Sequence, residues 1–242
     1  MYVDDHAGRD PATVWLHHGV GSTRSWESML PAAGGGRRTI AYDRRGFGRS
    51  AHDRAFTTAM FDEDTEDLRA LIHERDCAPA HVVGHSDGGT VALLLAARAP
   101  ELVLSVAVVA VHVRGDEMTV ATLRRMGQPD EWPEPMQRSL RRAHGDDWEA
   151  VAGRWHALWT SPEWERWSIV DELASVACPV LVMHGLHDDL SPPLHAEAIR
   201  EALPATRLSW VDTATHDPHR VDSARFVREL DAFWHDVEAV DG

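Results

Sequence analysis

Short apolar runs alternate along the chain with longer segments in which apolar residues recur every three or four positions. Runs of the first kind predict buried strands, and segments of the second kind predict amphipathic helices. The predicted strands are Val14–His17, Thr39–Tyr42, His81–Val83, Leu104–Val111, Pro179–Met183 and Arg207–Val211. The predicted helices are Ser25–Leu30, Met60–Arg75, Gly88–Ala99, Leu194–Leu203 and Ser223–Val237. This alternation favours an α/β fold with a mostly parallel sheet whose two faces are covered by helices.

Residues 113–173 interrupt this rhythm and contain six of the ten tryptophans. Apolar positions within Asp146–Trp159 repeat with the period of one helix face, and Asp146 or Asp147 stands where a cap is expected. We therefore predict a helical cap of residues 113–173, inserted into a core of residues 1–112 and 174–242. The tryptophans either pack this cap onto the core or line a cavity beneath it. Trp155 and Trp159 are the candidates for substrate contact.

Two other segments are assigned structural roles. Pro31–Gly36 has the composition of a turn and loop. The acidic residues of Asp62–Asp67 fall in the first turns of a predicted helix, where carboxylates interact favourably with the helix dipole. We expect them to form a solvated face.

Composition narrows the class of protein. The chain has 242 residues, a net charge of −15, and neither lysine nor asparagine. This charge disfavours nucleic acid and anionic membrane surfaces as partners, and the missing lysine excludes Schiff-base and P-loop chemistry. Cys77 and Cys178 are too few for a disulfide framework or a cysteine zinc site. Because the N-terminus is acidic and no apolar stretch has membrane-spanning length, we expect a cytoplasmic protein that acts on a small molecule.

Ser86 stands in Gly84-His85-Ser86-Asp87-Gly88, after a predicted strand and before a predicted helix. Such a turn is sharp, and its glycines avoid clashes that a Cβ atom would make. The N-terminus of the helix directs free N–H groups toward any anion formed on the serine. The alternative is a glycine-rich turn with an incidental serine, so the partners of Ser86 decide between the two.

Two later loops offer these partners. The loop after one predicted strand contains Asp188 and Asp189, and the loop after the next contains His216 and His219. Because the carboxyl ends of parallel strands share one edge, these side chains are expected near Ser86. A serine nucleophile needs a base, and the base needs an orienting carboxylate. The order serine, aspartate, histidine is the one that α/β-hydrolases use.

With these motifs the chain resembles the α/β-hydrolase family over essentially its whole length. His17-His18-Gly19-Val20-Gly21 is similar to the oxyanion loop of the family, and Tyr42-Asp43-Arg44-Arg45-Gly46-Phe47-Gly48-Arg49-Ser50 to its Asp-x-Arg-Gly-x-Gly-x-Ser turn. One departure is visible at the start. Tyr2–Asp5 offers at most a short strand before Val14–His17, so the first antiparallel hairpin of the family looks trimmed.

The resemblance implies a catalytic triad and an oxyanion hole. They are the nucleophile Ser86, the general base His216, the orienting acid Asp188, and the backbone N–H groups of Val20 and Asp87. Asp188 is preferred to Asp189 because the acid of the family stands three residues after the glycine of a Gly-x-x-Asp loop. His216 is preferred to His219 because the first histidine of the loop corresponds to the family's base.

Sixteen histidines also raise the question of a metal. The best candidate is the cluster His184-x-x-His187-Asp188-Asp189. It lacks the His-x-His-x-Asp-His spacing of metallo-lactonases and the His-Glu-x-x-His of zincins. We expect no metal and no cofactor, and a reaction that passes through an acyl-serine.

Asp87 bears on the substrate. A carboxylate beside a developing oxyanion is unfavourable unless a cation offsets it. Gly-x-Ser-Asp-Gly-Gly and the two-histidine loop look like the valacyclovir hydrolase type, which hydrolyses α-amino-acid esters and places this aspartate on the substrate ammonium. The alternative is a local role beside Arg114 or another arginine.

The sequence thus predicts a serine hydrolase for a small carboxylic ester, which is an amino-acid ester under the first interpretation of Asp87. A thioesterase, a lactonase or a carbon–carbon bond hydrolase would use the same triad, because fold and triad do not set the acyl donor. A ligand receptor with slow turnover would also keep these residues.

Overall fold

The computed structural model describes residues 1–33 and 35–240. Within these ranges the strands form one seven-stranded sheet of order β1-β3-β2-β4-β5-β6-β7. The strands are β1 (Tyr2–His6), β2 (Arg9–Leu16), β3 (Arg37–Asp43), β4 (Ala80–His85), β5 (Val103–Val109), β6 (Val180–Gly185) and β7 (Arg207–Val211). Strand β1 pairs antiparallel with β3 at one edge, and the other neighbours are parallel. The predicted α/β fold is confirmed, and its N-terminal edge is a single short strand.

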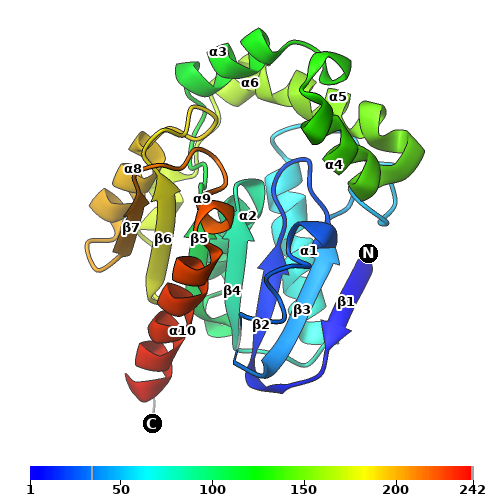
Figure 1. Ribbon diagram of the computed structural model, residues 1–242. Coiled ribbons are helices and arrows are strands. Elements are labelled where there is room, and N and C mark those ends of the chain that lie inside the picture. The colour runs from blue at the N-terminus through cyan, green and yellow to red at the C-terminus, as the bar shows by residue number, and fades with distance from the viewer. Residues whose placement is uncertain (34, 241–242) are drawn as a thin grey trace.

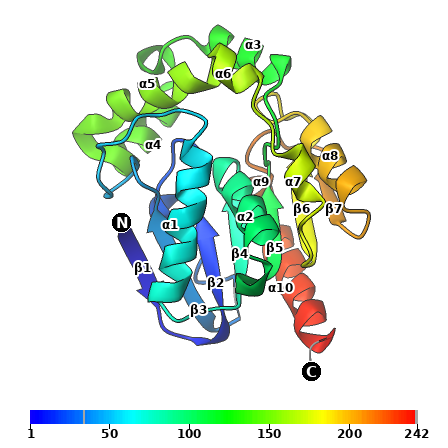
Figure 2. The ribbon, with the colours of Figure 1, turned by 180° about the vertical axis from the view of Figure 1, so that it is seen from behind.

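Helices cover both faces of the sheet, as Figures 1 and 2 show from opposite sides. The helices of the core are α1 (Met60–Glu74), α2 (Asp87–Arg98), α8 (Leu194–Ala202), α9 (Pro218–Val221) and α10 (Ser223–Val240). Helices α1 and α2 pack on one face, and α10 packs on the other. Strand β2 shows the alternation that serves both layers: Val14 and Leu16 join the apolar cluster on the α2 side, whereas Trp15 lies edge-on to Trp234 of α10.

The predicted helix Ser25–Leu30 is wrong. The chain forms a short 3₁₀ helix, η1 (Thr23–Ser25), followed by turns. A six-residue segment cannot sustain a helix by itself, and here two tertiary contacts dictate another path. The backbone N–H of Thr23 donates to Asp43 Oδ1 at 2.6 Å, and Trp26 packs edge-on to Trp15 at 5.0 Å.

The turn predicted over Pro31–Gly36 is present in residues 31–33 and 35–36, whereas residue 34 lies outside the described residues. The second strand begins earlier than the apolar run suggests, at Arg9 instead of Val14. Its first two residues, Arg9 and Asp10, are polar and exposed, so this part of the strand has no apolar pattern, and Arg9 pairs with Arg37 of β3.

Between β5 and β6 the chain forms a helical insertion over the carboxyl edge of the parallel strands (Figure 1). Its helices are α3 (Glu117–Met126), α4 (Glu134–His144), α5 (Trp148–Trp159), α6 (Pro162–Glu165) and α7 (Val170–Leu173). Helix α7 returns beside α2 and α8 of the core. The helix predicted within Asp146–Trp159 is confirmed as α5. Asp147 occupies its cap position without a capping side-chain bond, because this carboxylate lies 3.1 Å from His52 Nδ1 instead.

Five of the six tryptophans of the insertion form a continuous aromatic row. Successive ring centroids lie 6.5, 4.9, 3.7 and 4.8 Å apart along Trp132, Trp155, Trp159, Trp164 and Trp167. Such a row buries a large apolar area and stiffens the insertion. Among the described residues, no helix has both the length and the apolar composition required to traverse a bilayer.

Candidate active site

Ser86 lies in the turn between β4 and α2, with φ +54° and ψ −121°. A non-glycine residue with positive φ is strained, and such strain concentrates at functional positions. The flanking glycines permit the turn, because a Cβ atom on Gly84 would lie 2.3 Å from the carbonyl oxygen of Gly88, and one on Gly88 2.5 Å from that of Leu16. The backbone N–H of Ser86 is anchored to the carbonyl of Val109 at 2.8 Å.

A hydrogen-bonded chain joins Ser86 to two loops at the same sheet edge. His216 Nε2 lies 3.1 Å from Ser86 Oγ, and His216 Nδ1 lies 2.9 Å from Asp188 Oδ2. The other carboxylate oxygen of Asp188 accepts the N–H groups of Leu190 and Ser191 at 3.0 and 2.8 Å. The aspartate is therefore fixed by backbone donors, and it in turn fixes the imidazole.

The neighbouring alternatives, Asp189 and His219, are placed elsewhere. Asp189 is exposed and lies 3.6 Å from Arg125. His219 is buried, with its ring 5.2 Å from that of Trp26. The structure thus brings Asp188 and His216 to Ser86, as the motif positions predict.

The pKa values of His216 and Asp188 are consistent with the hydrogen bonds that join them to Ser86. Burial by itself lowers the pKa of His216, but the charge and the hydrogen bond of Asp188 outweigh burial and hold that pKa above its ordinary value. Burial also opposes ionisation of Asp188, yet its pKa lies below the usual range because His216 and the N–H of Ser191 stabilise the carboxylate. The pair is suited to accept a proton at the imidazole while the aspartate stays ionised.

The predicted oxyanion loop lies beside Ser86, and the insertion holds it in place. His144, the last residue of α4, donates from Nε2 to the carbonyl of Val20 and accepts the N–H of Gly48 at Nδ1, both at 2.9 Å. Asp43 accepts the N–H groups of Thr23 and Arg49 at 2.6 and 2.7 Å. The loop carrying Val20 is thereby tied to the turn after β3 and to α4.

A cavity of about 530 Å³ opens above Ser86, between the sheet edge and the insertion. Its wall includes Val20, Ser86 and His216 from the core, and Trp155 and Trp159 from α5. The two tryptophans singled out from the sequence therefore face the same space as the serine. His18 also lines the cavity, although nothing in the sequence distinguished it from its neighbour His17.

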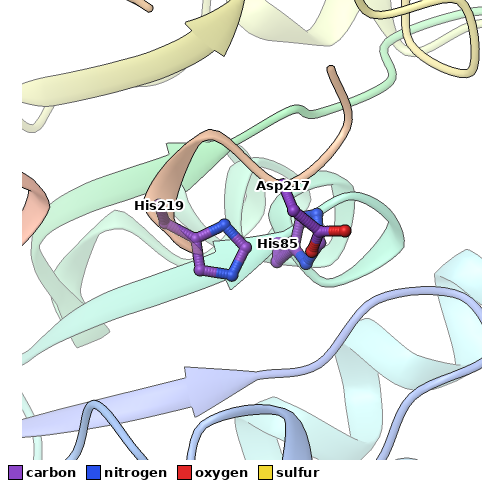
Figure 3. A group of neighbouring side chains, drawn as sticks. All are labelled: His85, Asp217 and His219. Atoms are coloured by element: carbon purple, nitrogen blue, oxygen red, sulfur yellow. The ribbon is translucent and has the colours of Figure 1, made fainter. Parts of the chain in front are cut away.

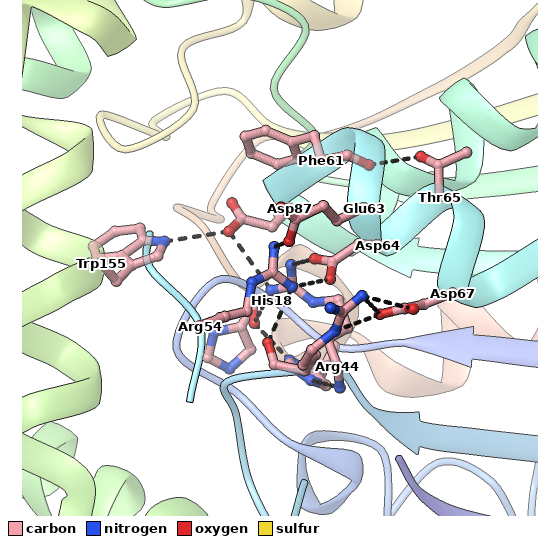
Figure 4. A network of polar contacts seen from close by, with 12 residues as sticks. His18, Arg44, Arg54, Phe61, Glu63, Asp64, Thr65, Asp67, Asp87 and Trp155 are labelled. Atoms are coloured by element: carbon pink, nitrogen blue, oxygen red, sulfur yellow. Dashed lines mark hydrogen bonds and ion pairs between the residues drawn. The ribbon is translucent and has the colours of Figure 1, made fainter. Parts of the chain in front are cut away.

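Asp87 lies outside this cavity wall and is fully buried. Its Oδ2 accepts the indole N–H of Trp155 at 3.2 Å and lies 3.6 Å from the guanidinium of Arg44 (Figure 4). Burial raises the pKa of Asp87 to about 6, although the charge of Arg44 opposes the rise. These contacts support the local role for Asp87 over the ammonium receptor, and the arginine concerned is Arg44 instead of Arg114.

The acidic run of α1 is not wholly solvated, contrary to the expectation for Asp62–Asp67. Asp64 is buried, accepts a hydrogen bond from Arg44 at 2.8 Å and also pairs with Arg54 (Figure 4). Helical periodicity turns Asp64 inward toward Arg44. Arg44 belongs to the turn after β3 that resembles the family motif. That motif is the sequence signal that could have indicated a buried arginine as the partner of Asp64.

Two groups of side chains in the described residues present ligand atoms within 4.8 Å of one another, close enough to share a metal ion. They are His85, Asp217 and His219 (Figure 3), and His112, Asp116 and His195. The sequence cluster around His184 is not one of them. His184 Nε2 donates to the carbonyl of Ser191 at 2.7 Å. Burial lowers the pKa of His85 to about 4, so this imidazole is neutral beside His216.

Comparison with known proteins decides the family. The model of the alpha/beta hydrolase family matches residues 14–229. The chain belongs to the α/β-hydrolase family. The match spans the serine turn, the acid loop and the histidine loop, so this α/β-hydrolase carries the order of motifs that the sequence suggested.

Several relatives resemble this hydrolase over most of its length. BpoC of Mycobacterium tuberculosis, whose name is that of a non-heme bromoperoxidase, is 29% identical over 89% of this chain and 90% of its own. Its crystal structure superposes with a TM-score of 0.78 at 26% identity, covering 98% of this chain and 96% of that one.

Two further relatives have hydrolase names. Rhodomycin D methylesterase DauP of Streptomyces sp. (strain C5) is 29% identical over 81% of each chain. The mouse serine hydrolase BPHL, which represents the valacyclovir hydrolase type, is 25% identical over 80% of this chain and 68% of its own. The expected resemblance to this type within the family is therefore confirmed, at low identity.

Proposed function

We propose that this α/β-hydrolase cleaves a small carboxylic ester through an acyl-serine intermediate, without a cofactor. The observation that carries the proposal is the continuous chain of hydrogen bonds from Ser86 Oγ through His216 to Asp188. The same arrangement on unrelated folds performs acyl transfer. The esterase and hydrolase relatives support the same reaction class.

In the proposed mechanism, Ser86 Oγ attacks the ester carbonyl while His216 Nε2 takes the hydroxyl proton. The backbone N–H groups of Val20 and Asp87 receive the developing oxyanion, and losing one such donor typically costs about 3 kcal/mol in the transition state. His216 then gives the proton to the departing alcohol. In the second half of the reaction His216 removes a proton from water, which attacks the carbonyl of the acyl-serine. The imidazolium then returns that proton to Ser86 Oγ as the bond to the acyl group breaks, so that the acid leaves and both side chains regain their starting forms.

The insertion supplies the roof of the site in this proposal. Trp155 and Trp159 present apolar surface to the acyl or alcohol part of the ester. Because Asp87 lies behind this wall and is already held by Arg44 and Trp155, we do not assign it to a substrate ammonium group.

The decisive experiment removes the nucleophile. Ser86→Ala is expected to reduce ester turnover by roughly 10⁶-fold and to abolish labelling by a fluorophosphonate. Ser139→Ala is the matched control, because Ser139 lines the same cavity on an exposed face of α4. It should retain labelling. Labelling of a folded Ser86→Ala variant at the wild-type level would refute the nucleophile assignment.

Turnover separates the enzyme from a receptor that keeps the triad. A hydrolase gives sustained product release after the acylation burst, whereas a receptor stalls near one event per molecule. A panel of esters, thioesters and lactones then identifies the acyl donor.

A further inference from the structure

Three arginines from three elements line the cavity that holds Ser86. They are Arg24 of η1, Arg142 of α4 and Arg220 of α9. Their side chains are 40%, 64% and 45% exposed, so each guanidinium borders solvent while its residue also borders the cavity. We call these three residues the arginine rim.

Contacts within the structure draw the arginine rim together on one side of the cavity. Arg220 donates to the backbone carbonyl of Ser25 at 3.2 Å, which places it against η1. Arg24 and Arg142 both face Glu27, at 3.8 and 2.5 Å. All three guanidinium groups therefore gather around residues 24–27.

The charge balance of this region is positive. Asp217 is the one carboxylate among the described residues of the cavity wall, and it lies 3.4 Å from Arg220. Glu27 is shared by Arg24 and Arg142. Three guanidinium groups thus face two carboxylates, which leaves one positive charge in a chain whose net charge is −15.

The histidines His18 and His112 of the wall add no charge to this balance. Burial lowers the pKa of His18 and of His112 well below the ordinary value, so both imidazoles are neutral. The carboxylate that sequence motifs suggested for a cationic substrate, Asp87, is outside the wall. The cavity therefore combines an apolar tryptophan surface with a cationic rim.

We propose that the substrate of this enzyme is an ester that carries a carboxylate, such as the monoester of a dicarboxylic acid. The arginine rim binds the carboxylate while the ester carbonyl lies at Ser86 and the connecting chain lies along Trp155 and Trp159. A single carboxylate matches the one uncompensated positive charge, and guanidinium groups bind carboxylates through paired hydrogen bonds. This inference rests on the proposed function and specifies its substrate class.

The test compares p-nitrophenyl esters of equal length whose far ends differ in charge. Mono-p-nitrophenyl adipate is anionic, a branched-chain alkanoate ester is its neutral counterpart, and p-nitrophenyl aminocaproate is cationic. We expect kcat/KM for the adipate ester to exceed that for the neutral ester by at least about tenfold at low salt, with a smaller ratio at high salt.

The double variant Arg24→Gln with Arg142→Gln should bring this ratio close to one. Its matched control is Arg138→Gln with Arg141→Gln, which removes the same charge from exposed positions of α4 that do not line the cavity. The control should keep the preference for the adipate ester, because it leaves the arginine rim in place. Any effect of the protein's overall charge should be the same in both variants.

The outcomes distinguish this inference from the proposed function. If no ester is hydrolysed, the proposed function itself fails. If esters are hydrolysed with equal efficiency, or if the cationic ester is preferred, the carboxylate assignment is overturned and the function stands. A stronger, rim-dependent preference for an ester with a phosphonate in place of the carboxylate would overturn the choice of carboxylate.

Discussion

Replacing Asp87 by asparagine should stabilise the protein at neutral and alkaline pH. Asp87 is fully buried, and burial raises its pKa from 3.8 to about 6. A carboxyl whose folded pKa exceeds its unfolded pKa destabilises the fold wherever the group is ionised in the folded state. From these two pKa values the cost is about 3 kcal/mol at pH 8 and falls below about 1 kcal/mol near pH 4. Asparagine removes this cost and keeps an oxygen for the indole N–H of Trp155.

The measurement is urea unfolding of wild type and Asp87→Asn, followed by tryptophan fluorescence, at several pH values between 4 and 8. Comparing the two proteins at each pH isolates the contribution of residue 87. The variant is expected to gain up to about 3 kcal/mol at pH 8, and the gain should shrink as the pH falls through 6.

Asp64→Asn is the matched control, because Asp64 is a second buried carboxylate on the same arginine. It bonds Arg44 at 2.8 Å and also pairs with Arg54. Removing one partner of such a buried ion pair costs about 3–5 kcal/mol, so this variant should lose stability. If Asp87→Asn is instead less stable than wild type at pH 8, with the same difference at pH 4, then Asp87 is a net stabilising ion and the reasoning is refuted.

Two other predictions concern the triad and the thiols. Asp188→Asn should lower kcat by about 10⁴-fold. It should also shift the acid limb of the pH–rate profile to lower pH, because the carboxylate that raises the pKa of His216 is lost. A pH–rate profile of the variant measures both effects, and unchanged turnover would contradict the assigned role. Burial raises the pKa of Cys77 and of Cys178 to about 11, so iodoacetamide at pH 8 should alkylate neither thiol in the native protein but both in urea. Mass spectrometry measures the alkylation, and fast modification of the native protein would show that the thiols are accessible.

The fold could be predicted from the sequence because its signals are local. From β4 into α2 the sequence has an apolar run, a glycine-flanked serine and an alanine-rich segment. Each of these forms the strand, turn or helix that its own residues predict. The later loops could be placed near Ser86 because parallel strands bring their carboxyl ends to one edge. The choice of Asp188 over Asp189 and of His216 over His219 came instead from the resemblance to the family, and the contacts of Ser86 agree with it.

The features that the sequence did not reveal depend on contacts between distant segments. The arginine beside Asp87 is Arg44, which comes from another strand end and carries no periodic signal of its own. The path after Ser22 is decided by Asp43 and Trp15 instead of by local helix propensity. The arginine rim is assembled from η1, α4 and α9, so no motif in the sequence announces it.

His144 makes the insertion and the catalytic core mutually dependent. One imidazole bonds the carbonyl of Val20 and the N–H of Gly48, so the geometry of the loop that carries Val20 depends on where α4 ends. Exchanging the insertion for that of another family member, as in a chimera built to change substrate range, would remove this ring together with the old cavity roof. A graft that keeps a histidine at position 144 would preserve the loop. In a graft without it, a change in activity could come either from the new cavity roof or from a displaced Val20 loop, and a substrate panel alone would not separate the two.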